Sequence, residues 1–473
     1  EEEKKETWNK TAMWCEANNQ KTDAINYYKK AENYERLILV MFMLPFAMAN
    51  RTARMLLEIL RPEICTIVPS AYIIRAKLYI ILGMPEQADK ELVTTIEALK
   101  AQPPSPEINR VLSGCYNFRG FAGIQTSTYT RDYNYLHYFK NARQYYDKSP
   151  FETKPPMSVG FLSTYVCRVN SEEKGEMERY IDAITAMVPH TSYTLGGFGS
   201  GMENLTRAEL AFFKGDLSVA EQAAYTALNK ARQADQYEIE NRALFYLLRI
   251  NLARGNWEAV QGVFKQMEAQ LDQPYYLNRF IFHDIVAGWY YAHIGQTEKP
   301  VLWLKNDFEE SDFGSTTFDL EILVKAKYHF SEKRYPAALA VLKSRELKDG
   351  HRDYVLGKIE KKALEAVCRH RSRDRSGAFA SLETAYRLAA PNGLDMPFIE
   401  LGKDMRSLAN AALKDGSNIP CEWLEKIRLG ASAYAKNLFT VISRLFDLST
   451  RPDSRDKFSR RNAVRIAAKM NLG

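Results

Sequence analysis

The chain has 473 residues, of which 46% are hydrophobic and 26% charged, and its formal net charge is +7. This balance is typical of globular proteins and excludes a largely disordered or membrane-embedded chain. The longest apolar run, residues 37–49, has 13 residues and includes a proline, whereas a membrane-spanning helix needs about 20. The length exceeds what one ordinary core supports, so we expect several domains or a repeat array.

Cysteine usage indicates a reducing compartment. The six cysteines are widely spaced, with no CxxC pair for zinc and no dense framework of the kind found in secreted domains. We therefore expect free thiols, a cytoplasmic location and no metal site.

Residues 1–40 are predicted to be helical almost from the first residue. The opening stretch EEEKKETWNK has neither an initiator methionine nor a signal peptide, and we interpret it as the start of a segment cut from a longer protein. A first repeat is expected here, because five residues recur with the spacing of a helix pair: Trp8, Ala12, Ala24, Tyr28 and Ala31.

Residues 41–395 repeat a pattern of helix, tight turn and helix. Gly215, Gly255 and Gly295 each end one apolar helix pattern and precede another, at a spacing of 40 residues. Further copies are ILGMPEQADKEL and SEKRYPAALAVLK. About seven such units, with almost no strand signal, predict an all-α, tetratricopeptide-like superhelix of antiparallel helix pairs. A generic helical bundle with chance spacing is the alternative.

The size of the recurring residues supports the repeat. Small residues fall where two helices must approach closely, and large apolar residues fall where they can plug the next pair. The small residues are Ala76, Ala208, Gly288 and Ala326 in first helices and Ala88, Ala220 and Ala338 in second helices, and the large ones are Leu92, Phe264, Leu304 and Leu342.

The pattern weakens in two places. Between Ser149 and Gly201, the stretches SPFETKPP and VPHTSYTLGGFGSG predict a long loop and breaks around an irregular helix pair. Residues 396–447, where Pro397 interrupts the pattern, are predicted to form closing helices that cap the array.

Catalytic motifs are missing from the sequence. The glycine-rich stretch LGGFGSG is followed by Met-Glu-Asn, whereas a phosphate-binding loop needs Lys-Ser or Lys-Thr, so we interpret it as a turn into the next helix. The basic stretch CRHRSRDRSG is better explained as a charged, solvated turn than as a nucleic-acid contact. We expect no enzymatic activity, no catalytic residue and no cofactor in this chain.

The inner face of the predicted superhelix is the candidate binding surface. Its positions combine aromatic rings with charged groups, which suits a sugar, a nucleotide, a peptide or a partner helix. We expect the double variant Arg249→Ala, Trp289→Ala to lose a ligand response and keep its fold. The predicted groove residues are Glu209, Phe212, Arg242, Phe245, Arg249, Phe282, Trp289 and Lys327.

Residues 448–473 form a basic tail. From Arg451 onward the tail has seven Arg or Lys residues against two Asp residues, which accounts for five of the seven net positive charges. Such local charge favours nucleic acid as a partner. The stretch RRNAVRIAAKM has an amphipathic pattern, but a helix this short needs something to pack against.

The chain resembles the helical-repeat sensor region of the MalT-like large transcriptional regulators, which end in a LuxR-type helix-turn-helix. The stretches that carry the resemblance are AFFKGDLSVAEQAAYTALNKARQADQYEIENRALFYLLRINLARGNWEAV and, more specifically, ETAYRLAAPNGLDMPFIELGKDM. In that family LSTR opens the DNA-binding domain, and NAVRIAAKMNL resembles its last helix. The resemblance implies a partial DNA-binding domain over 448–473.

The resemblance also implies roles for the tail and for absent parts. Arg460 and Arg461 would meet DNA phosphate, and residues of the last helix would support packing or a dimer contact: Ala463, Val464, Ile466 and Ala467. Only a dozen or so residues separate the two ends of the domain, so its middle is deleted or omitted from the sequence, and we favour omission. Residues 1–40 resemble the junction that follows an ATPase and winged-helix region, so ATP is expected only upstream of this chain.

Two functions of different class follow from these observations. The first is a signal-responsive transcriptional regulator that binds double-stranded DNA and a small-molecule effector or regulatory protein. A homo-oligomer is compatible with this function. The second is a tetratricopeptide-like interaction scaffold without DNA binding. Neither involves a membrane.

Overall fold

The computed structural model describes residues 1–18, 20–44, 48, 50–150, 159, 165–273, 276, 279–299, 318–344 and 354–449. Within these ranges every regular element is a helix and none is a strand, which confirms the all-α prediction. No helix in this part of the chain is both long and apolar enough to cross a membrane.

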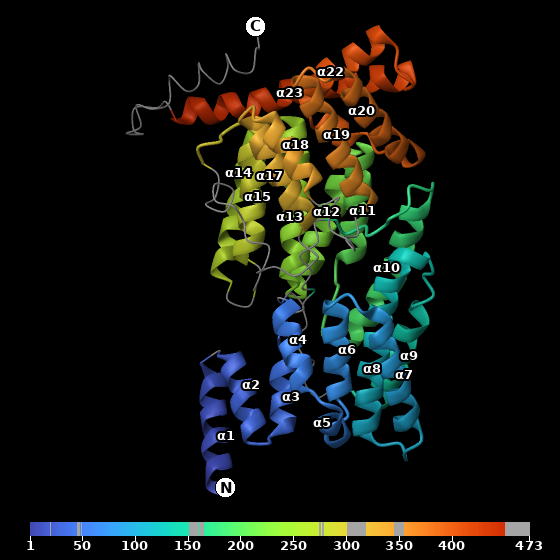
Figure 1. Ribbon diagram of the computed structural model, residues 1–473, viewed down its shortest axis with the longest axis vertical. Helices are drawn as coiled ribbons and strands as arrows, with labels where there is room; N and C mark the ends of the chain where they lie inside the picture. The colour runs from blue at the N-terminus through green and yellow to red at the C-terminus, as the bar shows by residue number, and fades with distance from the viewer. Residues whose placement is uncertain are drawn as a thin grey trace.

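Figure 1 shows the helices as an elongated stack, with the N-terminal ones at one end and the C-terminal ones at the other. The helices are α1 (Glu2–Ala17), α2 (Lys21–Lys30), α3 (Tyr34–Phe42), α4 (Asn50–Ile59), α5 (Pro62–Ile67), α6 (Ala71–Ile81), α7 (Pro85–Lys100), α8 (Pro106–Thr130), α9 (Leu136–Lys148), α10 (Glu176–Thr194), α11 (Met202–Lys214), α12 (Leu217–Gln233), α13 (Tyr237–Arg254), α14 (Trp257–Ala269), α15 (Arg279–His293), α17 (Phe318–Ser331), α18 (Tyr335–Lys343), α19 (Val355–Arg371), α20 (Arg375–Ala389), α21 (Met396–Ile399), α22 (Gly402–Asp415) and α23 (Cys421–Ser449), with short 3₁₀ turns at Gln270–Asp272 and Ala390–Asn392.

The predicted helix pairs are present, and their turns have the expected chemistry. α11 packs on α12, α13 on α14, α17 on α18 and α19 on α20. Gly215 and Gly255 end the first helices of two pairs with φ of +85° and +72°, which favours glycine. Asp216 and Asn256 then cap the second helices, because their side-chain oxygens accept the backbone N–H groups of residues 219 and 259.

Small residues sit at the predicted close approaches. Ala208 and Ala220 are fully buried in α11 and α12, and Ala326 and Ala338 are fully buried in α17 and α18. Leu92 and Leu342 are buried as predicted, and Phe264 packs against the main core. Leu304 lies outside the described residues.

The predicted break at VPHTSYTLGGFGSG begins later than expected. α10 continues through Pro189 to Thr194 and carries buried Val188 and Thr191 on its core face. A proline removes one backbone hydrogen bond, but here the burial of the flanking apolar surface holds the last turns of the helix. The glycine-rich turn starts only after Thr194, as Gly201 precedes α11 with φ of +94°.

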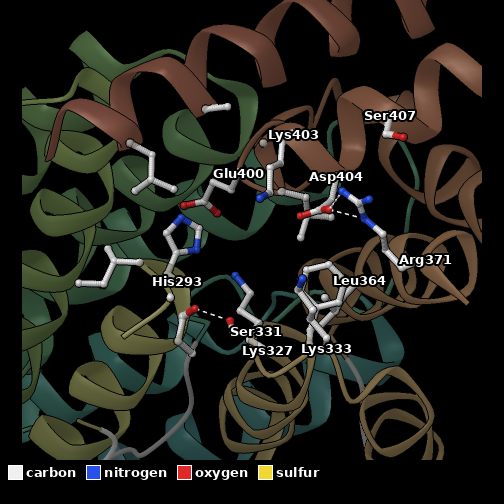
Figure 2. Close-up of a pocket in the computed structure, with 18 of the residues that line it drawn as sticks. His293, Lys327, Ser331, Lys333, Leu364, Arg371, Glu400, Lys403, Asp404 and Ser407 are labelled. Atoms are coloured by element: carbon white, nitrogen blue, oxygen red, sulfur yellow. Dashed lines mark hydrogen bonds and ion pairs between the residues drawn. The ribbon is translucent and has the colours of Figure 1, made fainter. Parts of the chain in front are cut away.

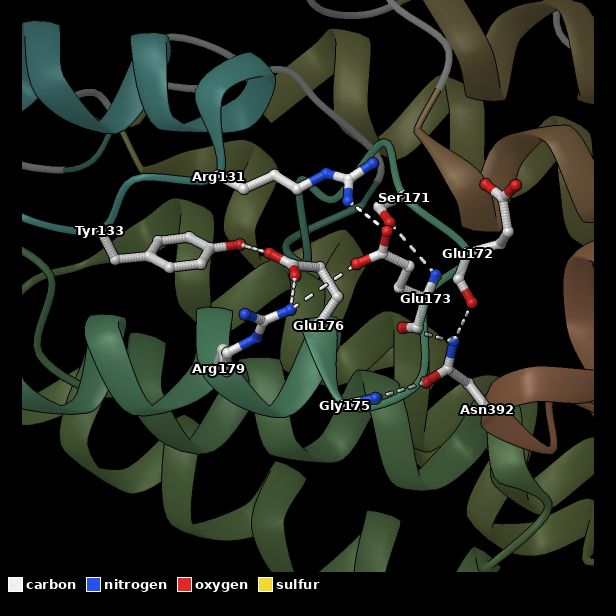
Figure 3. A network of polar contacts seen from close by, with 9 residues as sticks. All are labelled: Arg131, Tyr133, Ser171, Glu172, Glu173, Gly175, Glu176, Arg179 and Asn392. Atoms are coloured by element: carbon white, nitrogen blue, oxygen red, sulfur yellow. Dashed lines mark hydrogen bonds and ion pairs between the residues drawn. The ribbon is translucent and has the colours of Figure 1, made fainter.

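A polar network ties the start of α10 to two distant turns (Figure 3). Asn392 accepts a hydrogen bond from the backbone N–H of Gly175 at 3.2 Å and donates to the carbonyls of Glu172 and Glu173. The carboxylate of Glu176, which is buried, accepts from the Tyr133 hydroxyl and contacts Arg179. The loop before α10 is therefore fixed to both the α8–α9 turn and the turn after α20.

The last helices close the array on one side. α22 packs along α23, and α23 also contacts α13, where Asn437 donates to the carbonyl of Ala253 at 2.7 Å. His293 at the end of α15 and Tyr434 of α23 are hydrogen-bonded at 2.6 Å. Residues 396–447 contain α21, α22 and most of α23, which runs on to Ser449.

Lys77 provides a stability test for the N-terminal pairs. Its ammonium is 2% exposed and donates to the carbonyls of Phe42 and Leu44. Burial, with a smaller contribution from the charge of Lys21, lowers the pKa of Lys77 to about 7. Because the unfolded chain then binds more protons above pH 7, the free energy of unfolding should rise by about 1.5 kcal/mol between pH 7 and 8.5.

Chemical denaturation at both pH values measures this rise. Lys77→Met removes the titrating group and should remove the rise, while a Met change at exposed Lys29 should leave it unchanged. An equal pH dependence in wild type and Lys77→Met would contradict the assignment.

Candidate functional site

The predicted groove residues form one continuous cluster on four helices of the array. They come from α11, α13, α15 and α17, and each is at most 7% exposed. The Phe245 and Trp289 rings meet edge to face at 5.3 Å. Charged groups lie on ring faces: Arg242 on Phe282 at 5.1 Å and Lys327 on Trp289 at 5.1 Å. The sequence pattern therefore identified side chains that the fold does bring together.

Arg249 is the centre of this cluster and is fully buried. Its guanidinium lies 4.5 Å from the Phe212 ring centroid and also faces Phe245 and Trp289. Its Nη2 binds Glu360 at 2.8 Å and Glu400 at 2.5 Å, and its Nε binds Glu400 at 3.1 Å. Burial alone would lower the pKa of Arg249, but the two carboxylates outweigh it and hold that pKa well above its usual value.

Glu209 is occupied by a segment of the chain itself. Its carboxylate accepts the backbone N–H groups of Val166 at 3.0 Å and Cys167 at 2.5 Å, and also the Tyr246 hydroxyl. Burial raises the pKa of Glu209, although these hydrogen bonds oppose the rise. The segment 165–169 is also held at its other end, where the Val169 carbonyl accepts a hydrogen bond from the Val355 N–H at 2.8 Å.

The inner face of α11–α19 is closed because the later helices of the array fold back onto the earlier ones. α21 contacts both α11 and α19, and the Tyr165 hydroxyl donates to Glu360 from the segment 165–169. Arg249 and Trp289 therefore support the fold, so the double variant expected above to keep its fold would leave two buried carboxylates without their cation. The prediction that the groove residues contact a ligand stays a prediction.

A cavity of about 590 Å³ adjoins this cluster, between α15, α17, α19, α22 and α23 (Figure 2). Among the eight predicted groove residues, Lys327 reaches its wall. Apolar walls come from residues such as Leu364 and Leu438. The charged lining consists of Lys327, Lys333, Arg371, Glu400, Lys403, Asp404 and Arg406.

Both carboxylates of the cavity are already engaged. Glu400 is held by Arg249, and Asp404 accepts a hydrogen bond from Arg371 Nε at 2.6 Å. Burial first, and then the charges of Lys327 and Arg249, lower the pKa of His293 well below its usual value, so this ring is neutral near pH 7. The cavity consequently carries an excess of positive charge.

Sequence reasoning missed Glu360, Glu400 and Lys403. Glu360 lies in a helix rich in charged residues that resembles a solvated one, and the other two belong to the predicted cap. These residues join the site because the chain from α19 to α23 folds back so that α23 packs on α13. No local sequence pattern predicts this return.

Other motifs have structural explanations. A Cβ on Gly201 would lie 2.6 Å from the Ala227 carbonyl, so the glycine-rich stretch permits a close approach of two backbones. Within CRHRSRDRSG, Arg369 pairs with Glu365 and with Asp374, which caps α20. Across the described ranges, no group of three or more His, Cys, Asp or Glu residues could hold a metal ion.

The predicted DNA-contacting and helix-packing residues of the tail lie outside the described residues. These are Arg460, Arg461, Ala463, Val464, Ile466 and Ala467.

Comparison with known protein families identifies the central part of the chain. Residues 181–415 match the family model of the MalT-like TPR region. No curated protein matches the chain. This range runs from α10 to α22 and includes Arg249, both of its carboxylate partners and most of the cavity wall. Residues 181–415 are therefore a MalT-like helical repeat region.

Proposed function

We propose that this chain is the sensor part of a signal-responsive, DNA-binding transcriptional regulator that acts in the cytoplasm. The observation that carries the proposal is the MalT-like repeat region over residues 181–415, combined with a cavity inside it that is large enough for a small molecule. In this proposal the chain binds an effector and does not catalyse a reaction.

The basic tail supports DNA as the second partner. Clustered Arg and Lys residues neutralise phosphates regardless of sequence, whereas base reading needs a helix placed in the major groove. In this proposal Arg460 and Arg461 contact phosphate, while Ala463, Val464, Ile466 and Ala467 pack the last helix or join two copies. A complete recognition helix supplies the sequence preference.

The chain of 473 residues should bind DNA weakly, without promoter preference and with affinity that falls steeply as salt rises. A longer form that carries a complete helix-turn-helix should select specific promoter fragments. Titrations of both forms against promoter and scrambled duplexes at two salt concentrations measure the difference. If a genomic fragment selection with the longer form enriches no promoter, the regulator proposal fails and an interaction scaffold takes its place.

A further inference from the structure

Lys327 presents an unsatisfied charge to the cavity. It is 7% exposed, and among the described residues its Nζ has no hydrogen bond or ion pair, only the contact with the Trp289 ring. Figure 2 shows the ammonium pointing into the cavity, beyond Ser331 and opposite Lys403. An ammonium buried without a partner is costly, so an anion bound at this position would stabilise it.

Lys403 approaches the same space from the opposite side. It also has no hydrogen bond or ion pair within the described part of the chain. Burial lowers the pKa of Lys403; the charge of Asp404 opposes this, and nearby cations such as Arg371 add to it. Burial likewise lowers the pKa of Lys327, although the charges of Glu400 and Glu360 oppose the fall. Two lysines from different helices therefore face one another across the cavity, and neither is paired with a carboxylate of the described residues.

The start of α22 faces the same cavity. Leu401 precedes the helix without a capping side chain, and Leu401, Gly402 and Lys403 all line the wall. The first turn of a helix has unsatisfied N–H groups and a partial positive charge, which together favour an anion. The N–H groups of Gly402 and Lys403 thus add donors to the two ammonium charges, whereas the N–H of Asp404 already donates to the Leu401 carbonyl.

We propose that this cavity binds a small molecule that carries a phosphate group, with the phosphate held between Lys327, Lys403 and the start of α22. The inference rests on the sensing role proposed above and specifies its ligand class. The volume exceeds what a single ion needs, and Phe330, Leu364 and Leu438 offer apolar surface for the remainder of the molecule.

Charge balance favours a phosphate monoester over a carboxylate. Five cationic side chains line the cavity against two carboxylates, and both carboxylates already have Arg partners. A phosphate monoester has a charge of about −1.5 to −2 near pH 7 and three acceptor oxygens, so it can meet both lysines and the helix start at once. A carboxylate has half that charge and two oxygens.

Calorimetric titration of this chain with phenyl phosphate, benzoate and phenol tests the ligand class. Phenyl phosphate should bind at least tenfold more tightly than either of the other two. Absence of saturable binding, or equal affinity for neutral phenol, would overturn the proposal. Equal affinity for benzoate would overturn the assignment of phosphate.

A double variant tests the two lysines. Lys327→Met with Lys403→Met should lower the affinity for phenyl phosphate at least tenfold, because both charge-assisted contacts are lost. The matched control, Lys265→Met with Lys436→Met, makes the same change in net charge at exposed helix positions and should bind as wild type does. Retained affinity in the first variant would refute the site.

A second readout does not depend on any variant. An anion bound between two ammonium groups favours their charged form, so its affinity depends on their protonation. The affinity for phenyl phosphate should therefore fall as pH rises from about 7.5 to about 10.5, where even an ordinary lysine is half deprotonated while the charge of the ligand no longer changes. An affinity that stays constant over this range would refute the site. None of these binding experiments contains DNA. A failure to bind phenyl phosphate is therefore distinct from a failure of the promoter selection.

Discussion

Replacing Arg249 by alanine is expected to destabilise the protein by about 3–5 kcal/mol, the largest effect of a single substitution that we predict. Glu360 and Glu400 would remain buried with no cation between them. The change also removes the guanidinium from the faces of Phe212 and Trp289. Chemical denaturation followed by circular dichroism measures the loss.

Two further variants separate the charge from the general effect of truncation. Arg249→Met combined with Glu360→Gln and Glu400→Gln removes the network together and should recover most of the loss, because neither carboxylate then stays buried without its cation. Arg254→Ala breaks the partly exposed pair with Glu221 and should cost less than about 1 kcal/mol. If Arg249→Ala and Arg254→Ala lower the free energy of unfolding equally, the buried network contributes no more stability than the partly exposed pair.

Replacing Glu209 by alanine should release the segment 165–169 from the inner face. The backbone N–H groups of Val166 and Cys167 and the Tyr246 hydroxyl would lose their shared acceptor, at a cost of about 3 kcal/mol or more. Hydrogen exchange of peptides that cover this segment should accelerate, and the buried Cys167 thiol should become open to alkylation, which mass spectrometry detects.

Tyr246→Phe is the matched control for this prediction. It removes the hydroxyl contact but keeps both backbone hydrogen bonds to Glu209, so exchange at Val166 and Cys167 should change little. If Glu209→Ala leaves both exchange and alkylation as in wild type, the carboxylate does not hold the segment.

The sequence predicts the repeat well because each pair specifies itself locally. A glycine with positive φ, an Asp or Asn cap and a buried alanine all lie within one helix hairpin, as Gly215, Asp216 and Ala220 show. The composition of the inner face follows from the same periodicity, which is why the repeat register alone predicts that Arg249 and Trp289 share one face.

The site itself was only partly predictable because its contacts are distant in sequence. Arg249 meets Glu360 and Glu400 across separations of 111 and 151 residues. Such contacts depend on how tightly the array curls, which small rotations between successive pairs determine. The repeat pattern therefore predicts Lys327 on the inner face, but it predicts neither the cavity nor Lys403 on its opposite wall.

The path of α23 has a mechanical consequence. This helix lies beside the cavity at Tyr434 and Leu438 and stays packed on the core through Val441, Ile442 and Leu445. From Tyr434 to Ser449 the axis rises by about 22 Å, so a tilt of the whole helix by about 10° about Tyr434 displaces Ser449 by about 4 Å. α23 therefore acts as a rigid rod, and a shift beside the cavity reaches Ser449 only together with the packing of α23 on α13 and α14.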